Sequence, residues 1–180
     1  MTAAQADLQI DRPATADGAA LWRIARDSEA LDLNSSYSYL LWCRDFAGTS
    51  AVARDERGEP VGFVTGYVRP DRPHTLLVWQ VAVDGAYRGR GLAASLLDGL
   101  VARVRREHGV TGVETTITPG NTASERLFTS FAERHGAPLE REVLFPAALF
   151  PDGPHDSEVL YRIGPPLPLT SPHATRSDSS

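Results

Sequence analysis

Hydrophobic and polar positions along this chain follow two different periods in turn. Short segments that are apolar, or that alternate, predict strands, because successive side chains of an extended backbone point to opposite faces. The predicted strands cover residues 8–10, 50–54, 60–68, 76–83, 113–118, 139–145 and 157–163. Apolar residues three or four positions apart predict helices. These helices cover residues 15–28 and 36–47, and the segments with apolar side chains from Leu92 to Val104 and from Leu127 to Phe131.

The order of these elements decides the fold class. It runs strand, two helices, three strands, helix, strand, helix, two strands. Three consecutive strands before the third helix require a mixed sheet, not a doubly wound parallel one. Residues 76–83 are nearly continuously apolar, which predicts a central strand buried on both faces. We therefore expect an α/β (α+β) fold, a mixed central sheet of about six or seven strands with about four helices on its two faces.

The two ends of the chain differ from this patterned part. Residues 1–7 are small and polar, and residues 165–180 are rich in Pro, Ser and Thr. Such segments contain too few apolar groups to offset the entropy lost on ordering, so both are expected to be disordered. Residues 8–164 are expected to form a single domain.

Composition argues against several classes of protein. A formal net charge of −5 argues against nucleic-acid binding, which needs a basic surface. No apolar run is long enough for a membrane span, and the first residues lack a signal-peptide pattern. The single cysteine, Cys43, cannot form an internal disulfide, and its apolar neighbours indicate a core thiol. We therefore expect a cytoplasmic protein that binds neither nucleic acid nor membrane.

One strand-to-helix junction has the composition of a phosphate-binding site. The strand that ends at Val83 leads into an amphipathic helix through Asp84-Gly85-Ala86-Tyr87-Arg88-Gly89-Arg90-Gly91. Backbone N–H groups at a helix N-terminus bind phosphate, glycines allow close approach, and arginines add charged donors. A P-loop is excluded because no Lys follows the glycines, and a dinucleotide fingerprint lacks its third glycine.

The spacing Arg88-x-x-Gly91-x-Ala93 resembles the pyrophosphate-binding signature of the GNAT superfamily of N-acetyltransferases. The resemblance implies that the turn holds the pyrophosphate of coenzyme A and that the preceding strand pairs with its pantetheine arm. Asn121 to Phe128 resembles the Asn-x-x-Ala-x-x-Leu-Tyr helix start of the same family. The implied acetyl-CoA contacts are Val81, Ala82, Val83, Arg88, Gly89, Arg90, Gly91, Leu92, Ala93, Asn121 and Phe128.

Two details of the second segment matter for the expectations. Thr122 and Glu125 are expected to form a capping box at the start of the helix. Phe128 stands where the family usually has a tyrosine, which is thought to protonate the departing thiolate. A phenyl ring cannot donate a proton, so another tyrosine, water or unassisted departure of the thiolate remain as alternatives.

Four further segments narrow the resemblance to one family within the superfamily. Residues 31–39, 62–67, 78–83 and 158–164 are similar to the diaminobutyrate acetyltransferases of ectoine biosynthesis. The resemblance covers about residues 8–164. It implies a cytoplasmic homodimer that transfers acetyl from acetyl-CoA to the γ-amine of L-2,4-diaminobutyrate, giving N4-acetyl-L-2,4-diaminobutyrate, the precursor of a compatible solute.

That substrate has one carboxylate and two ammonium groups, so its pocket needs both carboxylates and hydrogen-bond donors. Asp32 and Glu158 are the candidate partners of the amines. Strand alternation predicts that Trp79 and Val81 share a face while Gln80 points away, so the indole N–H is a candidate donor to the carboxylate. The remaining candidate pocket residues are Asn34, Ser36, Tyr37 and Tyr39.

The implied reaction is direct attack by the amine, without a covalent enzyme intermediate. The predicted catalytic residues are Glu158 and Asp32 as amine partners and Val81, near which a backbone N–H would stabilise the oxyanion at a strand irregularity of the family. A carboxylate, directly or through water, or His155 could accept the proton, although a loop histidine beside Pro154 is more often solvated. No metal is expected. Two alternatives stay open, a GNAT enzyme for another small amine and a non-catalytic acetyl-CoA sensor.

Overall fold

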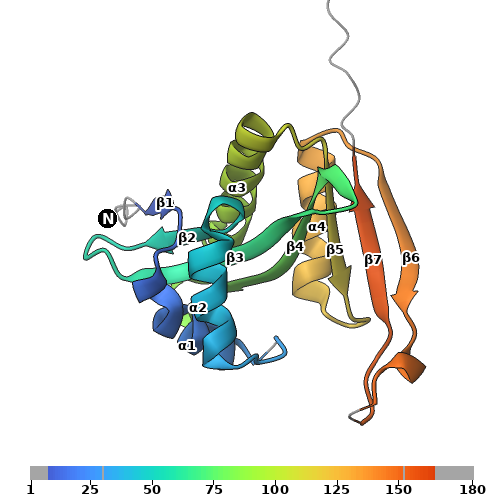
Figure 1. Cartoon of the computed structure of the whole chain (residues 1–180), viewed down its shortest axis with the longest axis horizontal. Coiled ribbons are helices and arrows are strands. Elements are labelled where there is room, and N and C mark those ends of the chain that lie inside the picture. The colour runs from blue at the N-terminus through green and yellow to red at the C-terminus, as the bar shows by residue number, and fades with distance from the viewer. Residues whose placement is uncertain (1–7, 30, 152, 165–180) are drawn as a thin grey trace, which may run out of the picture.

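A computed structural model describes residues 8–29, 31–151 and 153–164 (Figure 1). The expected disorder of residues 1–7 and 165–180 lies outside the described residues. The described part contains seven strands and four α-helices in the predicted order, so the predicted fold class is confirmed. None of the helices in these ranges has the length and apolar character needed to cross a bilayer.

The seven strands form one mixed sheet in the order β1-β2-β3-β4-β5-β7-β6. Only the β4–β5 pair is parallel among the strand pairs of the described residues. The strand bounds are β1 Gln9–Asp11, β2 Ala51–Arg54, β3 Pro60–Arg69, β4 Arg72–Val83, β5 Gly112–Ile117, β6 Leu139–Phe145 and β7 Glu158–Ile163.

Helices cover both faces of this sheet (Figure 1). Their bounds are α1 Gly18–Ser28, α2 Ser36–Asp45, α3 Leu92–His108 and α4 Thr122–Arg134. Adjacent residues of β2 contact opposite layers, because Ala51 and Ala53 pack with α3 and α4 while Val52 packs with α1 and α2. The sheet therefore lies between two apolar cores.

Two helix starts differ in detail from the sequence prediction. Asp17 stands at the N-cap of α1, but its carboxylate accepts the N–H of Ala14 and pairs with Arg54 at 2.7 Å. The predicted capping box of Thr122 is wrong. Asn121 is the N-cap of α4, and its side chain accepts the Ser124 N–H at 3.2 Å.

The parallel strands β4 and β5 separate halfway along their length. They pair from Thr75–Gly112 to Val78–Thr115, after which β4 continues beside β3 and β5 continues beside β7. The gap between their C-terminal halves leaves the β4 backbone beyond Val78 without a strand partner on that side. Polar backbone groups that have lost a strand partner are available to a ligand.

A β-bulge marks the same level of β4. Thr65 of β3 pairs with Gln80 and Gly66 pairs with Val78, so Trp79 is an extra residue. A Cβ at Gly66 would lie 2.6 Å from the carbonyl oxygen of Leu77, so the close approach of the two strands requires glycine there.

The bulge overturns the predicted orientation of three side chains in β4. The Trp79 ring packs against Trp42 of α2, with 4.9 Å between ring centroids, and Gln80 also bonds to α2 through Tyr39. Val81 instead packs against the core on the α3 and α4 side. The expectation that Trp79 and Val81 share a face while Gln80 points away is therefore wrong, because simple alternation fails across the extra residue.

Candidate active site

The gap between β4 and β5 opens into a cavity of about 440 Å³. Segments 78–81 of β4 and 115–117 of β5 form two walls, and the start of α4 forms a third. Residues 31–34 before α2, the loop residues 154–156 and Glu158 at the start of β7 complete the lining. Cavities at the carboxyl ends of separating parallel strands are a common place for ligands in α/β folds.

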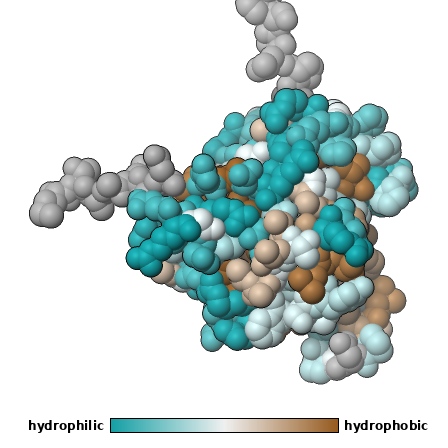
Figure 2. All heavy atoms as spheres, turned by 60° about the vertical axis from the view of Figure 1, so that its left-hand side comes forward, coloured by the Kyte–Doolittle hydropathy of each residue, from teal (hydrophilic) through white to brown (hydrophobic). Residues whose placement is uncertain are grey.

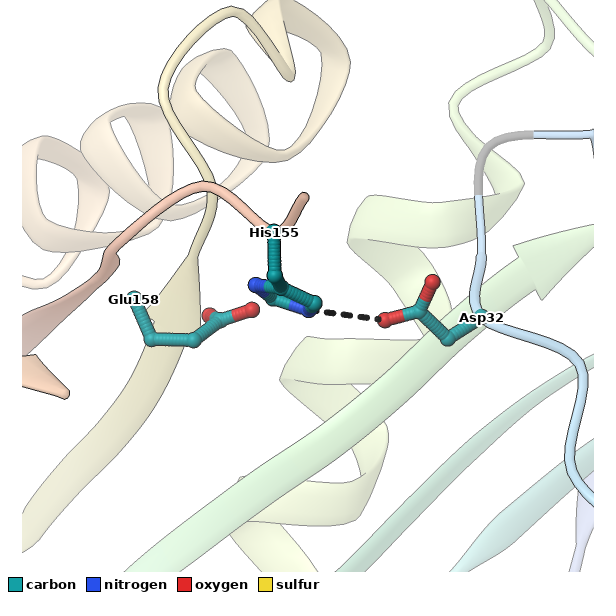
Figure 3. A group of neighbouring side chains, drawn as sticks. All are labelled: Asp32, His155 and Glu158. Carbon is teal, nitrogen blue, oxygen red and sulfur yellow. Dashed lines mark ion pairs between the residues drawn. The ribbon is translucent and has the colours of Figure 1, made fainter. Parts of the chain in front are cut away.

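Three titratable side chains, two from these loops and one from the start of β7, meet in the cavity (Figure 3). Each of Asp32, His155 and Glu158 offers an oxygen or nitrogen atom that lies within 4.8 Å of those of the other two. The His155 Nε2 atom lies 3.7 Å from the Asp32 Oδ2 atom. The structure thus brings together the two predicted carboxylates, and it also places between them His155, which the sequence offers only as an alternative proton acceptor.

His155 is held in one orientation by its neighbours. Its ring stacks on Phe150 with 3.7 Å between centroids and 10° between planes. Its Nδ1 atom hydrogen-bonds to the carbonyl oxygen of Asp156, which can only accept, so Nδ1 carries the proton and Nε2 faces Asp32. That hydrogen bond raises the pKa of His155, and the charges of Asp32 and Glu158 raise it further.

The cluster attracts positive charge. Two carboxylates and an imidazole bind an ammonium group, and they are also the donor types that a divalent cation accepts. The Asp32 side chain is 88% exposed, whereas that of His155 is 23% exposed. Asp32 is therefore free to contact a molecule that enters the cavity.

The other predicted pocket residues divide into two groups. Asn34 and Trp79 line the cavity, and Asn34 Nδ2 donates to the backbone carbonyl of Asp32 at 3.2 Å. Ser36, Tyr37 and Tyr39 lie outside its lining, which corrects the prediction that they form the pocket. The periodicity of α2 explains this, because Tyr37 is 65% exposed while Tyr39 faces the core.

A second groove of about 280 Å³ adjoins the cavity. Both are lined by Asn121 and Ser124 of the α4 start and by Val81 of β4. Among the predicted cofactor contacts, the groove is lined by Val81, Ala82, Val83, Arg88, Ala93 and Asn121. Phe128 lines the first cavity instead.

The glycine turn lies at the end of this groove. Gly89 and Gly91 have φ angles of 74° and 73°, a left-handed conformation that favours glycine. The first helical hydrogen bond of α3 runs from Ser95 N–H to the Gly91 carbonyl, so the N–H groups just before Ser95 point out of the helix end. The Leu92 side chain is buried, which limits its contribution there to the backbone.

Both arginines of the turn are exposed on the protein surface. Arg88 Nε donates to the Val83 carbonyl at 3.2 Å, and the Arg90 guanidinium lies 5.4 Å from the centre of the Tyr87 ring. These contacts hold two cations on the turn that leads into the N-terminus of α3. An anion of the size of a phosphate fits this chemistry.

Cys43 plays no part in the site. It is 2% exposed, and burial raises the pKa of its thiol to about 11. A thiol in this state is protonated near neutral pH and is a poor nucleophile. This agrees with the expectation of a core cysteine.

Comparisons with known proteins identify relatives of the chain. Residues 18–132 match the acetyltransferase (GNAT) family. The chain is 81% identical over 165 residues to the L-2,4-diaminobutyric acid acetyltransferase of Streptomyces coelicolor, covering 92% of this chain and 97% of that relative. It is 76% identical over 176 residues to the same enzyme of Streptomyces avermitilis, covering 92% and 98%.

A solved structure agrees with these sequence relatives. It is the diaminobutyrate acetyltransferase of Paenibacillus lautus, in complex with its substrate L-2,4-diaminobutyric acid and coenzyme A. The two chains share 42% identity and superpose with a TM-score of 0.83, covering 89% of this chain and 96% of that one. The likeness therefore extends over nearly all of the described fold.

Proposed function

Because this chain belongs to the GNAT acetyltransferase family, we propose that it transfers the acetyl group of acetyl-CoA to the γ-amine of L-2,4-diaminobutyrate. The product is N4-acetyl-L-2,4-diaminobutyrate, the precursor of ectoine. The observation that carries the proposal is the meeting of Asp32, His155 and Glu158 in a cavity that adjoins a phosphate-type groove. The similarity to the Streptomyces and Paenibacillus enzymes supports the choice of substrate.

Acetyl-CoA occupies the groove with its pyrophosphate at the glycine turn. The N-terminus of α3 and the Arg88 guanidinium stabilise the phosphate charges. The pantetheine arm runs along the unpaired edge of β4 from Val83 toward Val81, which leads the thioester to the wall shared by groove and cavity. Two polar groups of the arm can replace the strand partner that β4 has lost.

Diaminobutyrate occupies the cavity with its amines near the carboxylates. Asp32 and Glu158 pair with the ammonium groups, while Asn34 and Trp79 offer N–H donors on the cavity wall to the substrate carboxylate. Pairing with fixed charges orients the γ-amine toward the thioester. Holding the reacting atoms together in this way supplies much of the rate enhancement of an acyl transfer.

The γ-ammonium has to lose a proton before its nitrogen can attack. We assign this step to His155, because its Nε2 atom faces the cavity and its Nδ1 proton is held by Asp156. The negative charge of Asp32 and Glu158 stabilises the imidazolium that results. The amine then attacks the thioester carbon and forms a tetrahedral adduct, whose oxyanion is stabilised by an N–H of β4 near the bulge and Val81. Collapse of the adduct breaks the C–S bond, and the second proton of the attacking nitrogen passes to the thiolate sulfur.

The departing thiolate needs a different donor from the usual tyrosine. Phe128 lies at that position and has no proton to give. Ser124 precedes it by one helical turn on the same face of α4, and it lines both the cavity and the groove. We assign to the Ser124 hydroxyl the hydrogen bond that stabilises the sulfur as it leaves.

We further propose that the protein is a cytoplasmic homodimer. The edge strand β6 is exposed along most of its length, and Val143, Phe145 and Leu149 are 59%, 45% and 64% exposed. Hydrophobic surface also gathers toward the lower right of the view in Figure 2. An exposed edge strand that carries apolar side chains is open to pairing with another chain, and a second copy of this protein would cover it.

Incubation of the purified protein with acetyl-CoA and a panel of amines tests the proposed function. Release of free thiol with diaminobutyrate, and a product acetylated on N4 by NMR, are expected. Release with spermidine but not with diaminobutyrate would favour another small-amine acetyltransferase. Coenzyme A binding without thiol release for any amine would favour a sensor.

A further inference from the structure

We propose that Gln80 is a positioning residue, which holds the Asp32 loop against the reaction cavity by joining it to Tyr39 in the core. The inference rests on the proposed function, because it assigns a role within the same site. Neither Gln80 nor Tyr39 is assigned a step of the acetyl transfer. Their importance follows from the hydrogen bonds that connect them.

Gln80 uses both ends of its amide. Its Nε2 atom donates to the backbone carbonyl of Asp32 at 3.0 Å, and its Oε1 atom accepts from the Tyr39 hydroxyl at 3.0 Å. Burial raises the pKa of Tyr39, so its hydroxyl stays protonated and acts as the donor. A carboxylate in place of the amide could accept from Tyr39 but could not donate to Asp32.

Gln80 and Tyr39 are both buried, which indicates that the hydrogen bonds of the Gln80 amide are a specific feature of the fold. Gln80 is 5% exposed and Tyr39 is 0% exposed. An amide taken out of water is destabilising unless it is hydrogen-bonded, and here both of its ends are satisfied. The β-bulge breaks the regular alternation along β4, so that Gln80 faces α2 and does not share the face of Val78.

Tyr39 and Asp32, the two residues that Gln80 connects, differ in how firmly they are packed. The Tyr39 ring packs edge-on against Phe63 in the apolar core, with 6.2 Å between centroids and 83° between planes. The Asp32 side chain is 88% exposed and has few contacts of its own. Its carbonyl, however, accepts from both Gln80 and Asn34. The core therefore sets the direction in which the Asp32 carboxylate enters the cavity.

Kinetics of Gln80→Leu test the inference. We expect the KM for diaminobutyrate to rise about tenfold, with the kcat and the Kd for coenzyme A little changed. The reason is that the loss of one hydrogen bond in the site weakens the binding of the substrate by about that factor. Tyr39→Phe should give a smaller rise, since it removes only one of the two bonds. Thr65→Val is the matched control, because Thr65 pairs with Gln80 across the bulge and its buried hydroxyl has no partner among the described residues.

A double mutant separates positioning from general structural damage. If Gln80 acts through Asp32, adding Gln80→Leu to Asp32→Ala should leave the KM at the value of Asp32→Ala alone. Multiplicative effects, or a wild-type KM in folded Gln80→Leu, would overturn the inference. If Gln80→Leu does not fold, the same comparison is made with Tyr39→Phe. An inactive wild-type protein would instead refute the proposed function.

Discussion

Nε2 of His155 lies 3.7 Å from Oδ2 of Asp32, although loops near opposite ends of the described chain carry the two residues. This contact identifies Nε2 as the nitrogen that can accept a proton from the substrate, because the hydrogen bond to the Asp156 carbonyl keeps the proton of the neutral ring on Nδ1. A neutral His155 therefore presents its lone pair to the cavity. Once protonated, it is stabilised by the neighbouring carboxylates.

His155→Gln should lower kcat by at least about 100-fold, the smaller end of what a positioned general base contributes. The pKa of His155 is raised from 6.5, chiefly by its bond to the Asp156 carbonyl. Only the neutral ring accepts a proton, so kcat/KM of the wild type should fall as the pH drops through an apparent pKa above 6.5. Rates measured from about pH 6 to about pH 9 check this.

The same pH series in His155→Gln serves as the control. The acidic limb that belongs to the imidazole should be missing from it, whereas the Kd for coenzyme A should match the wild type. An acidic limb that persists unchanged in this variant would assign the proton to another group, with Asp32 and Glu158 as the next candidates.

Arg88→Ala should weaken coenzyme A binding by about 10- to 150-fold, since a charge-assisted contact to phosphate contributes about 1.5 to 3 kcal/mol. Isothermal titration with coenzyme A measures the change directly. Arg106→Ala is the matched control, because Arg106 is an exposed arginine at the other end of α3. Equal dissociation constants for wild type and Arg88→Ala would remove this residue from the cofactor site.

Ser124→Ala should lower kcat about tenfold, because it removes one hydrogen bond to a charged leaving group. Adding Phe128→Tyr to this variant should restore part of the rate, since a phenol then stands one helical turn away. Ser130→Ala, on the exposed side of α4, is the control. A wild-type kcat in Ser124→Ala would mean that water, and not the Ser124 hydroxyl, donates the hydrogen bond to the departing sulfur.

The homodimer proposal is tested by sedimentation velocity. Phe145→Glu places a charge on the apolar edge of the sheet, and we expect it to shift the protein from dimer to monomer. Ala102→Asp adds a charge on the exposed face of α3 and should leave the dimer intact. A wild type that sediments as a monomer at every concentration would contradict the proposal.

Periodicity predicted the fold well because the elements obey simple alternation over most of their length. The strand at 139–145 has the predicted bounds, and the order of all elements is as expected. The sequence predictions fail where a local contact interrupts the regular alternation of side chains. The bulge at Trp79 depends on a close backbone approach at Gly66, and no pattern of hydrophobic and polar side chains predicts it.

The sequence predicts only part of the site, because the surroundings of some side chains depend on contacts that form only in the folded chain. Asp32 and Glu158 were found because the substrate implied by the resemblance requires carboxylates. The sequence offers His155 only as an alternative proton acceptor, because its environment depends on a loop that meets Asp32 only in the folded chain. One signal could have identified Gln80, a long polar side chain in an otherwise apolar strand, since burial there demands partners on another element.

Glu114 of β5 forms a buried ion cluster next to the point where β4 and β5 separate. Its side chain is 1% exposed, and its carboxylate lies 2.9 Å from Arg69, 3.1 Å from Arg162 and 3.5 Å from Arg72. Glu114→Ala should lower the free energy of unfolding by about 2 to 3 kcal/mol, because it removes a buried carboxylate that three partly exposed arginines share, although Arg69 keeps Asp71 and Arg162 keeps Glu142. Urea unfolding followed by circular dichroism measures the change.

Asp71→Ala provides the comparison for this prediction. Asp71 pairs with Arg69 at 2.8 Å, but its side chain is 64% exposed. An exposed pair contributes at most about 1 kcal/mol, so this variant should unfold close to the wild-type midpoint. If the two variants lose the same free energy of unfolding, the position of Glu114 in the sheet, next to the opening of the cavity, confers no special stability. A large loss for Glu114→Ala alone would show that the buried carboxylate holds the three arginines, and with them the strands on both sides of the opening.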